Sequence, residues 1–152
     1  MKLNTNKPQI LNGGIAVDDR GSVRFVNDFF FNNVKRFYQV ENLNTDIIRA
    51  FHGHMKEAKY VYVTQGTLLM NIVHLDSIKN PSKKEPVLKF VLSAAKPQVL
   101  YIPPQFANGF KSLEPDTKIM FFSTSTLEDS LKDDYRFPVD YWGSDIWKTV
   151  NK

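Results

Sequence analysis

The histidines are the residues that most directly suggest chemistry in this chain. Only three occur, and two of them, His52 and His54, lie two positions apart in the segment RAFHGH, which runs from Arg49 to His54. On an extended strand, residues i and i+2 point to the same face, so both imidazoles would enter one side of a sheet. Arg49 would lie on the opposite face unless a bulge shifts the strand. The spacing predicts a functional site built on this segment.

Metal binding is one chemistry that two such histidines could perform. Glu57 adds a carboxylate and is separated from His54 by two residues, Met55 and Lys56. Two histidines and one carboxylate at this spacing are an incomplete ligand set for a catalytic metal. We therefore expect no metal and no other cofactor, and metal-dependent dioxygenase chemistry is the less favoured alternative.

Acid–base catalysis is the other chemistry that the pair could perform. Histidine titrates near neutral pH and can take a proton in one step and return it in the next. Removing a proton next to a ketone creates an enolate, whose oxygen then needs a cation or a hydrogen-bond donor nearby. Arg49, Lys59 and the second histidine are the candidates for that role. The third histidine, His74, lies in a strand-like run and is expected to be structural.

Composition excludes several classes of function. The 152 residues contain no cysteine, which removes disulfides and thiolate chemistry and fits a cytoplasmic protein. The net charge is only +4, and its basic residues are scattered apart from residues 79–84 (KNPSKK), so we expect no nucleic-acid partner. No apolar run is long enough to cross a membrane, and the N-terminal residues do not resemble a secretory signal, so we expect no membrane association.

The elements that must position these residues are predominantly short strands. Strand-like runs separated by turn signals recur every 8–12 residues, which is typical of a sandwich or barrel. Residues 60–64 (YVYVT) and 67–75 (TLLMNIVHL) flank Gln65-Gly66 and are predicted to form a hairpin. One helical turn is expected at 127–131, and the aromatic segment 134–147 is expected to pack back on the barrel. We predict one all-β domain over residues 1–152, a cupin-type jelly-roll barrel with a short helical or irregular C-terminal segment.

Several motifs along these elements resemble one enzyme family. From about Asp18 to Trp147 the chain resembles the dTDP-4-dehydrorhamnose 3,5-epimerases and their relatives, the dTDP-4-keto-6-deoxyglucose 3,4-ketoisomerases. The most specific match is residues 101–110 (YIPPQFANGF), similar to the signature IPPGFAHGF. The other matching elements are Asp19-Arg20-Gly21, Arg49-Ala50-Phe51-His52, Lys59, Gly66 and Leu92-Ser93.

The resemblance implies a substrate and a set of roles. The partner would be a nucleotide-diphosphate sugar, with His52 as the base that removes a proton next to the ketone and His54 as its partner acid or a second base. Arg49 and Lys59 would stabilise the enolate or hold phosphate. Arg20 would bind the diphosphate, often from the neighbouring subunit, so a homodimer is expected. Gln39 and Asn108 are further candidates for substrate binding.

Departures from the family keep the reaction open. His54 stands where the epimerases usually have Gln, and with Lys56 it gives the HxHxK pattern of the ketoisomerases. The catalytic tyrosine of the epimerases falls near Thr126, so Tyr101, Tyr135 or Tyr141 would have to replace it as the acid. Asn108 replaces a pocket histidine.

The acidic residue that orients the base in the epimerases falls beyond this C-terminus, so we expect the base to lack such a partner. An epimerase acting in cell-envelope polysaccharide synthesis is favoured; a 3,4-ketoisomerase and a non-catalytic sugar-nucleotide-binding cupin are the alternatives.

Overall fold

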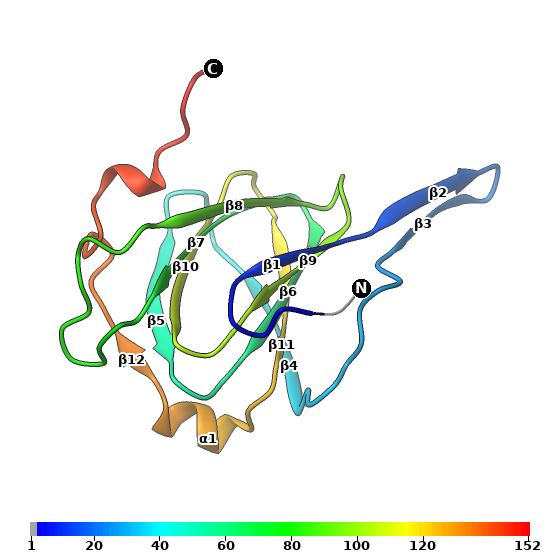
Figure 1. The fold of residues 1–152 in the computed structure, drawn as a ribbon. Helices are drawn as coiled ribbons and strands as arrows, with labels where there is room; N and C mark the ends of the chain where they lie inside the picture. Colours follow the sequence, from blue (N-terminus) through cyan, green and yellow to red (C-terminus); the bar gives the residue numbers. More distant parts are fainter. Residues whose placement is uncertain (1–2) are drawn as a thin grey trace.

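The computed structural model describes residues 3–152 (Figure 1). Strands follow one another along most of the chain, with one short α-helix and one 3₁₀ turn near its end. In chain order the elements are β1 (Gln9–Asn12), β2 (Gly14–Asp18), β3 (Gly21–Phe25), β4 (Arg36–Glu41), β5 (Ile48–His54), β6 (Lys59–Gln65), β7 (Thr67–His74), β8 (Leu88–Ser93), β9 (Gln98–Ile102), β10 (Phe106–Ser112), β11 (Lys118–Ser123), α1 (Leu127–Lys132), β12 (Tyr135–Arg136) and η1 (Asp145–Trp147).

Two antiparallel sheets face each other and enclose the core. The first sheet has the strand order β1-β9-β6-β11-β4, and the second has the order β12-β5-β10-β7-β8. Apolar side chains from both sheets fill the space between them, among them Val61, Leu68, Met70, Leu100 and Phe121, all nearly fully buried. The predicted all-β barrel is confirmed, as is the helical turn at 127–131.

The predicted hairpin over residues 60–75 is wrong. β6 and β7 follow one another in sequence but belong to different sheets: β6 pairs with β9 and β11, and β7 pairs with β8 and β10. Gly66 forms the corner with φ of +77°, and a Cβ there would come within 2.2 Å of the Thr117 hydroxyl. A glycine between two apolar runs suits such a corner as well as a hairpin turn, so the local pattern could not distinguish them.

The C-terminal segment covers the outer face of the second sheet. The Trp142 ring packs edge-on against Phe51 with centroids 4.9 Å apart, and Trp147 lies 5.4 Å from the same ring. Both indole nitrogens donate to backbone carbonyls, Trp142 to Ser82 and Trp147 to Val139. The expectation that this aromatic segment packs back on the barrel is confirmed.

β2 and β3 form a two-stranded hairpin that projects from the barrel (Figure 1). Its side chains are mostly exposed, including Val17 and Val23. Within residues 3–152 no helix is long and apolar enough to cross a membrane.

Candidate active site

A cavity of about 380 Å³ opens between the two sheets. β4, β6 and β11 of the first sheet contribute to its lining, and β5 and β10 contribute from the second sheet. The lining residues are Tyr38, Val40, Ile48, Arg49, Ala50, His52, Lys59, Asn108, Phe110 and Phe121. Four of the residues singled out from the sequence therefore share one cavity: Arg49, His52, Lys59 and Asn108.

A register shift brings Arg49 and His52 to the same side of β5. Asn108 of β10 pairs with His52, and Phe110 pairs with Arg49, so three steps along β5 match two steps along β10. The extra residue on β5 is a β-bulge, which reverses the alternation of side chains beyond it. In a regular strand, residues three apart would point to opposite faces.

Asp134 is the hydrogen-bond partner of His52. The Nδ1 atom of His52 lies 3.2 Å from Oδ1 of Asp134, whose other oxygen accepts a hydrogen bond from Nε of Arg136 at 2.9 Å. β12 begins directly after Asp134 and pairs with β5, which places the carboxylate beside the ring. A proton on Nδ1 donated to Asp134 leaves the lone pair of Nε2 free to act as a base. The expectation of a base without an acidic partner is wrong.

The electrostatics of this pair favour a neutral imidazole next to a carboxylate. Burial lowers the pKa of His52 below its ordinary value, although the charge of Asp134 opposes the shift. Burial raises the pKa of Asp134, but the hydrogen bonds from Arg136 and His52 outweigh it, so this pKa lies below its usual value. His52 is thus deprotonated at neutral pH, as a general base must be.

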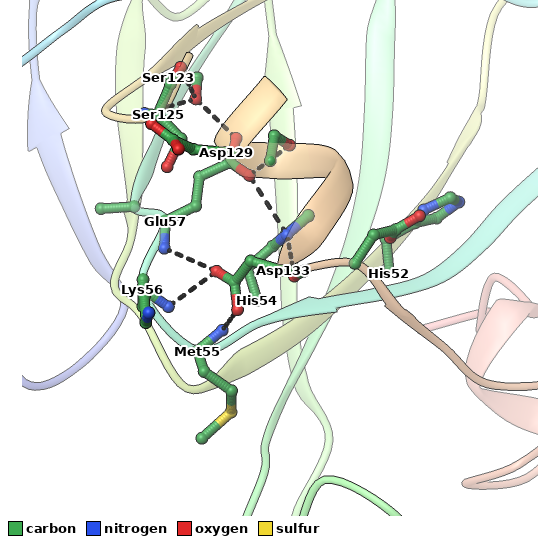
Figure 2. Close-up of polar contacts among 12 residues, drawn as sticks. His52, His54, Met55, Lys56, Glu57, Ser123, Ser125, Asp129 and Asp133 are labelled. Carbon is green, nitrogen blue, oxygen red and sulfur yellow. Dashed lines mark hydrogen bonds and ion pairs between the residues drawn. The ribbon is translucent and has the colours of Figure 1, made fainter. Parts of the chain in front are cut away.

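His54 lies on the same strand but does not line the cavity. Its Nδ1 atom is 2.7 Å from the carbonyl oxygen of Asp133 and 3.2 Å from Oε2 of Glu57. Figure 2 shows the His54 ring inside this polar network and the His52 ring apart from it. Burial and the nearby charge of Lys59 lower the pKa of His54. These contacts favour a structural role for His54 over the catalytic role expected from the HxH spacing.

Glu57 is the centre of that buried network. The Ser123 hydroxyl donates to one of its oxygens at 2.6 Å (Figure 2). The Ser130 hydroxyl donates to the other at 2.7 Å, and Arg36 approaches to 3.6 Å. These contacts, with that of His54, occupy the carboxylate. Among residues 3–152, no group of three or more His, Asp or Glu side chains is arranged to hold a metal ion.

Asp133 fixes the turn between β5 and β6. Its carboxylate accepts hydrogen bonds from three successive backbone amides, those of Met55, Lys56 and Glu57, at 3.0, 2.9 and 3.2 Å (Figure 2). Three amides converging on one carboxylate make a strong anchor because the acceptor is charged. Since Asp134 is the next residue, the same anchor holds the partner of His52 in place.

Lys59 has a buried side chain that lines the cavity. Burial lowers the pKa of Lys59. The buried carboxylate of Glu57 is paired with Arg36 and His54 instead of with this lysine. The ammonium is therefore available to an anionic group in the cavity.

Arg49 and Asn108 are held in place by neighbouring polar groups. Nε of Arg49 donates to the side-chain oxygen of the buried Asn42 at 2.8 Å, which leaves its terminal nitrogens for a ligand. Asn108 donates to the backbone oxygen of His52 at 3.2 Å.

Two of the residues predicted to bind substrate lie elsewhere. Gln39 is exposed and points to the other face of β4, because alternate residues of a strand project to opposite sides and Tyr38 and Val40 face inward. Arg20 lies at the tip of the β2–β3 hairpin, with its side chain 86% exposed and paired with Asp18. Within one chain, neither side chain lines the cavity.

The tyrosines are placed differently from what the sequence suggested. Thr126 caps α1, accepting a hydrogen bond from the amide of Asp129 at 3.1 Å. Tyr101 packs with Tyr60 outside the barrel, and the Tyr141 hydroxyl donates to the Pro81 carbonyl at 2.8 Å. The tyrosine that does line the cavity is Tyr38. The alternation of residues 34–40 (VKRFYQV) indicates this position, because it predicts that Tyr38 and Val40 lie on one face of the strand.

Comparison with known proteins supports the same family as the motifs. A family model described as dTDP-4-dehydrorhamnose 3,5-epimerase matches residues 14–137. Among curated proteins, no significant sequence match is found.

Solved structures of several sugar isomerases share the fold. The dTDP-4-dehydrorhamnose 3,5-epimerase from Bacillus anthracis, with TDP and PPi bound, is 22% identical, with a TM-score of 0.71 over 90% of this chain and 81% of that one. A sugar 3,4-ketoisomerase from Thermoanaerobacterium thermosaccharolyticum in complex with TDP is 16% identical, with a TM-score of 0.68 over 90% and 93%. A 3'-monoepimerase from Streptomyces bikiniensis in complex with dTDP is 16% identical, with a TM-score of 0.70 over 91% and 73%.

Proposed function

The chain belongs to the dTDP-4-dehydrorhamnose 3,5-epimerase family, and we propose that it is an epimerase of a nucleotide-linked 4-keto-6-deoxy sugar. The observation that carries the proposal is the His52–Asp134 pair facing a cavity that also holds Lys59 and Arg49. A deprotonated base beside two cations is what the abstraction of a proton next to a ketone requires.

The proposed reaction begins with proton removal by Nε2 of His52. Asp134 holds the ring in orientation and stabilises the imidazolium that forms, as an acidic partner does for other catalytic histidines. The electrons of the broken C–H bond move onto the ketone oxygen, where Lys59 supplies the compensating positive charge. Arg49, fixed by Asn42, and Asn108 would position the sugar and its diphosphate.

Ketoisomerisation is the alternative outcome of the same enolate. The HxHxK pattern and the fold shared with 3,4-ketoisomerases favour it, whereas the enclosure of His54 in the Glu57 network leaves only one histidine in the cavity. Product analysis by NMR after incubation with dTDP-4-keto-6-deoxyglucose tests the proposal. An inverted ring carbon with the ketone still at C4 supports epimerisation, a ketone at C3 supports ketoisomerisation, and unchanged substrate supports a non-catalytic binding protein.

The pH dependence of catalysis follows from the lowered pKa of His52. Because its pKa lies below the ordinary 6.5, kcat/KM should rise with pH through a limb below pH 6.5 and then level off. Asp134→Asn removes the charge that opposes this shift, so the limb should move to lower pH while kcat falls by about 10²-fold. Full pH profiles of both enzymes check this. Asp140→Asn, at an exposed position, is the control, and a limb that moves to higher pH in Asp134→Asn contradicts the assignment.

We also propose that the working unit is a homodimer. The outer face of the first sheet carries an aromatic cluster of Phe29, Phe31, Phe37, Tyr60 and Phe122, with Phe31 and Phe37 more than half exposed. A hollow of about 690 Å³ lies beside it. Apolar surface of this kind is typical of an interface.

The β2–β3 hairpin would then extend towards the second subunit. The hairpin projects from the barrel (Figure 1). Val17 and Val23 are exposed, and Arg20 lies in the turn between the two strands. In this arrangement Arg20 would bind the diphosphate in the partner's cavity through charge-assisted hydrogen bonds. The resemblance to the family also supports a cytoplasmic enzyme that supplies cell-envelope polysaccharide synthesis.

Complementation tests the role of Arg20 across subunits. Arg20→Ala and His52→Asn should each be nearly inactive at low substrate, because each lacks one part of every site. Co-expressed, they should recover about a quarter of the wild-type activity, since half of the dimers are mixed and each mixed dimer has one complete site. Arg24→Ala is the control, because Arg24 of the same hairpin is bound to the Ala94 carbonyl in its own chain. Full activity of Arg20→Ala alone, or no recovery on co-expression, contradicts the proposal.

A further inference from the structure

Tyr38 also lines the cavity, and the scheme above does not use its hydroxyl. Tyr38 comes from β4 of the first sheet, whereas His52 comes from β5 of the second. The two side chains therefore enter the cavity from opposite sheets. Inversion of a carbon centre needs one group on each face of the sugar ring, one to take a proton and one to give it.

The Tyr38 ring is held by its neighbours, whereas its hydroxyl forms no hydrogen bond with residues 3–152. The ring stacks on Phe121 with centroids 5.1 Å apart and planes within 6°, and the guanidinium of Arg36 lies 4.8 Å from its centroid. Burial, followed by the charge of Glu57, raises the pKa of Tyr38 to about 12, and no hydrogen bond contributes to the shift. The hydroxyl is thus protonated at neutral pH and has an unused donor.

We propose that Tyr38 is the acid that returns a proton to the sugar, in place of the tyrosine that is absent near Thr126. This inference rests on the proposed epimerase function and deepens it. The position near Thr126 cannot supply the acid, because Thr126 caps α1. The three tyrosines expected as replacements lie outside the cavity. Tyr101 packs outside the barrel, Tyr135 packs against the cluster of Phe51, Phe137 and Trp142, and the Tyr141 hydroxyl donates to the Pro81 carbonyl.

The proton balance of the step is simple. His52 removes the proton from one face of the carbon next to the ketone, and the C–H electron pair forms the enolate. The O–H bond of Tyr38 then breaks, its proton adds to the same carbon from the opposite face, and the ketone re-forms with inverted configuration. The imidazolium of His52 and the tyrosinate of Tyr38 return to their starting states when solvent carries one proton from the first to the second.

Tyr38→Phe separates this role from a structural one, because it keeps the ring that stacks on Phe121 and removes only the hydroxyl. In D₂O with dTDP-4-keto-6-deoxyglucose, the variant should still exchange the substrate proton through His52, returning deuterium to the same face. Inversion should fall by about 10²-fold or more. NMR of a single sample measures both rates, and the signature is deuterated substrate without inverted product. Tyr141→Phe, which removes a hydroxyl outside the cavity, should leave both rates unchanged.

Two results would overturn the inference: inversion by Tyr38→Phe at the wild-type rate, or an equal loss of exchange and inversion in a variant whose thermal unfolding is unchanged. The proposed function fails separately, if the wild-type protein neither exchanges nor inverts the sugar.

Discussion

His52→Asn should lower turnover by about 10²- to 10⁴-fold, the usual contribution of a positioned general base. The asparagine can still hydrogen-bond to Asp134 but cannot take a proton from carbon. Because His52 is only partly buried and lies at the cavity wall, the folded structure should survive the change. Initial rates on dTDP-4-keto-6-deoxyglucose, with thermal unfolding measured alongside, give the comparison.

His74→Asn is the matched control for this experiment. His74 is at the end of β7, its ring lies against Phe106, and it does not line the cavity. Its replacement should leave turnover unchanged. Equal losses in the two variants, or wild-type turnover in His52→Asn, would remove His52 from the mechanism.

Glu57→Ala should have the largest effect on stability, about 3–5 kcal/mol of the free energy of unfolding. The carboxylate is fully buried and accepts from Ser123 and Ser130 while facing Arg36 and His54. Its removal leaves two hydroxyls and a guanidinium inside the protein without their carboxylate partner. Such groups destabilise the fold because they have given up their hydrogen bonds to water without replacing them.

Urea denaturation measures the effect, with Glu128→Ala as control. Glu128 is exposed on α1 and pairs with Lys132 at 2.7 Å, a surface pair worth about 0.5 kcal/mol or less. If Glu57→Ala lowers the free energy of unfolding by less than about 1 kcal/mol, the Glu57 carboxylate does not stabilise the fold as proposed.

The residue pattern predicts the barrel, and the segment from Arg49 to His52 that it singles out does line the cavity. Alternating apolar residues predict strands wherever one face is buried, and this signal is local. The same rule, applied to β4, places Tyr38 inward and Gln39 outward, so the structural positions of both could have been derived. Arg49 and His52 share a side only because of the bulge between them on β5, and no local sequence pattern shows whether such a bulge is present.

Contacts between distant residues were beyond prediction from the sequence. Asp134 lies 82 positions from His52, and only the pairing of β12 with β5 brings them together. His54 follows the HxH spacing, but Glu57, Ser123 and Ser130 enclose it in a network that depends on three separate elements. The corner at Gly66 has the local pattern of a hairpin, and only the assignment of β6 and β7 to different sheets distinguishes the two.

The most direct test of the account is the fate of the protons next to the ketone of dTDP-4-keto-6-deoxyglucose in D₂O. If His52, oriented by Asp134, is the base, the wild-type protein should replace at least one of these protons with deuterium. His52→Asn should exchange it at least about 10²-fold more slowly, and His74→Asn at the wild-type rate. Exchange that persists unchanged in His52→Asn would contradict the central claim.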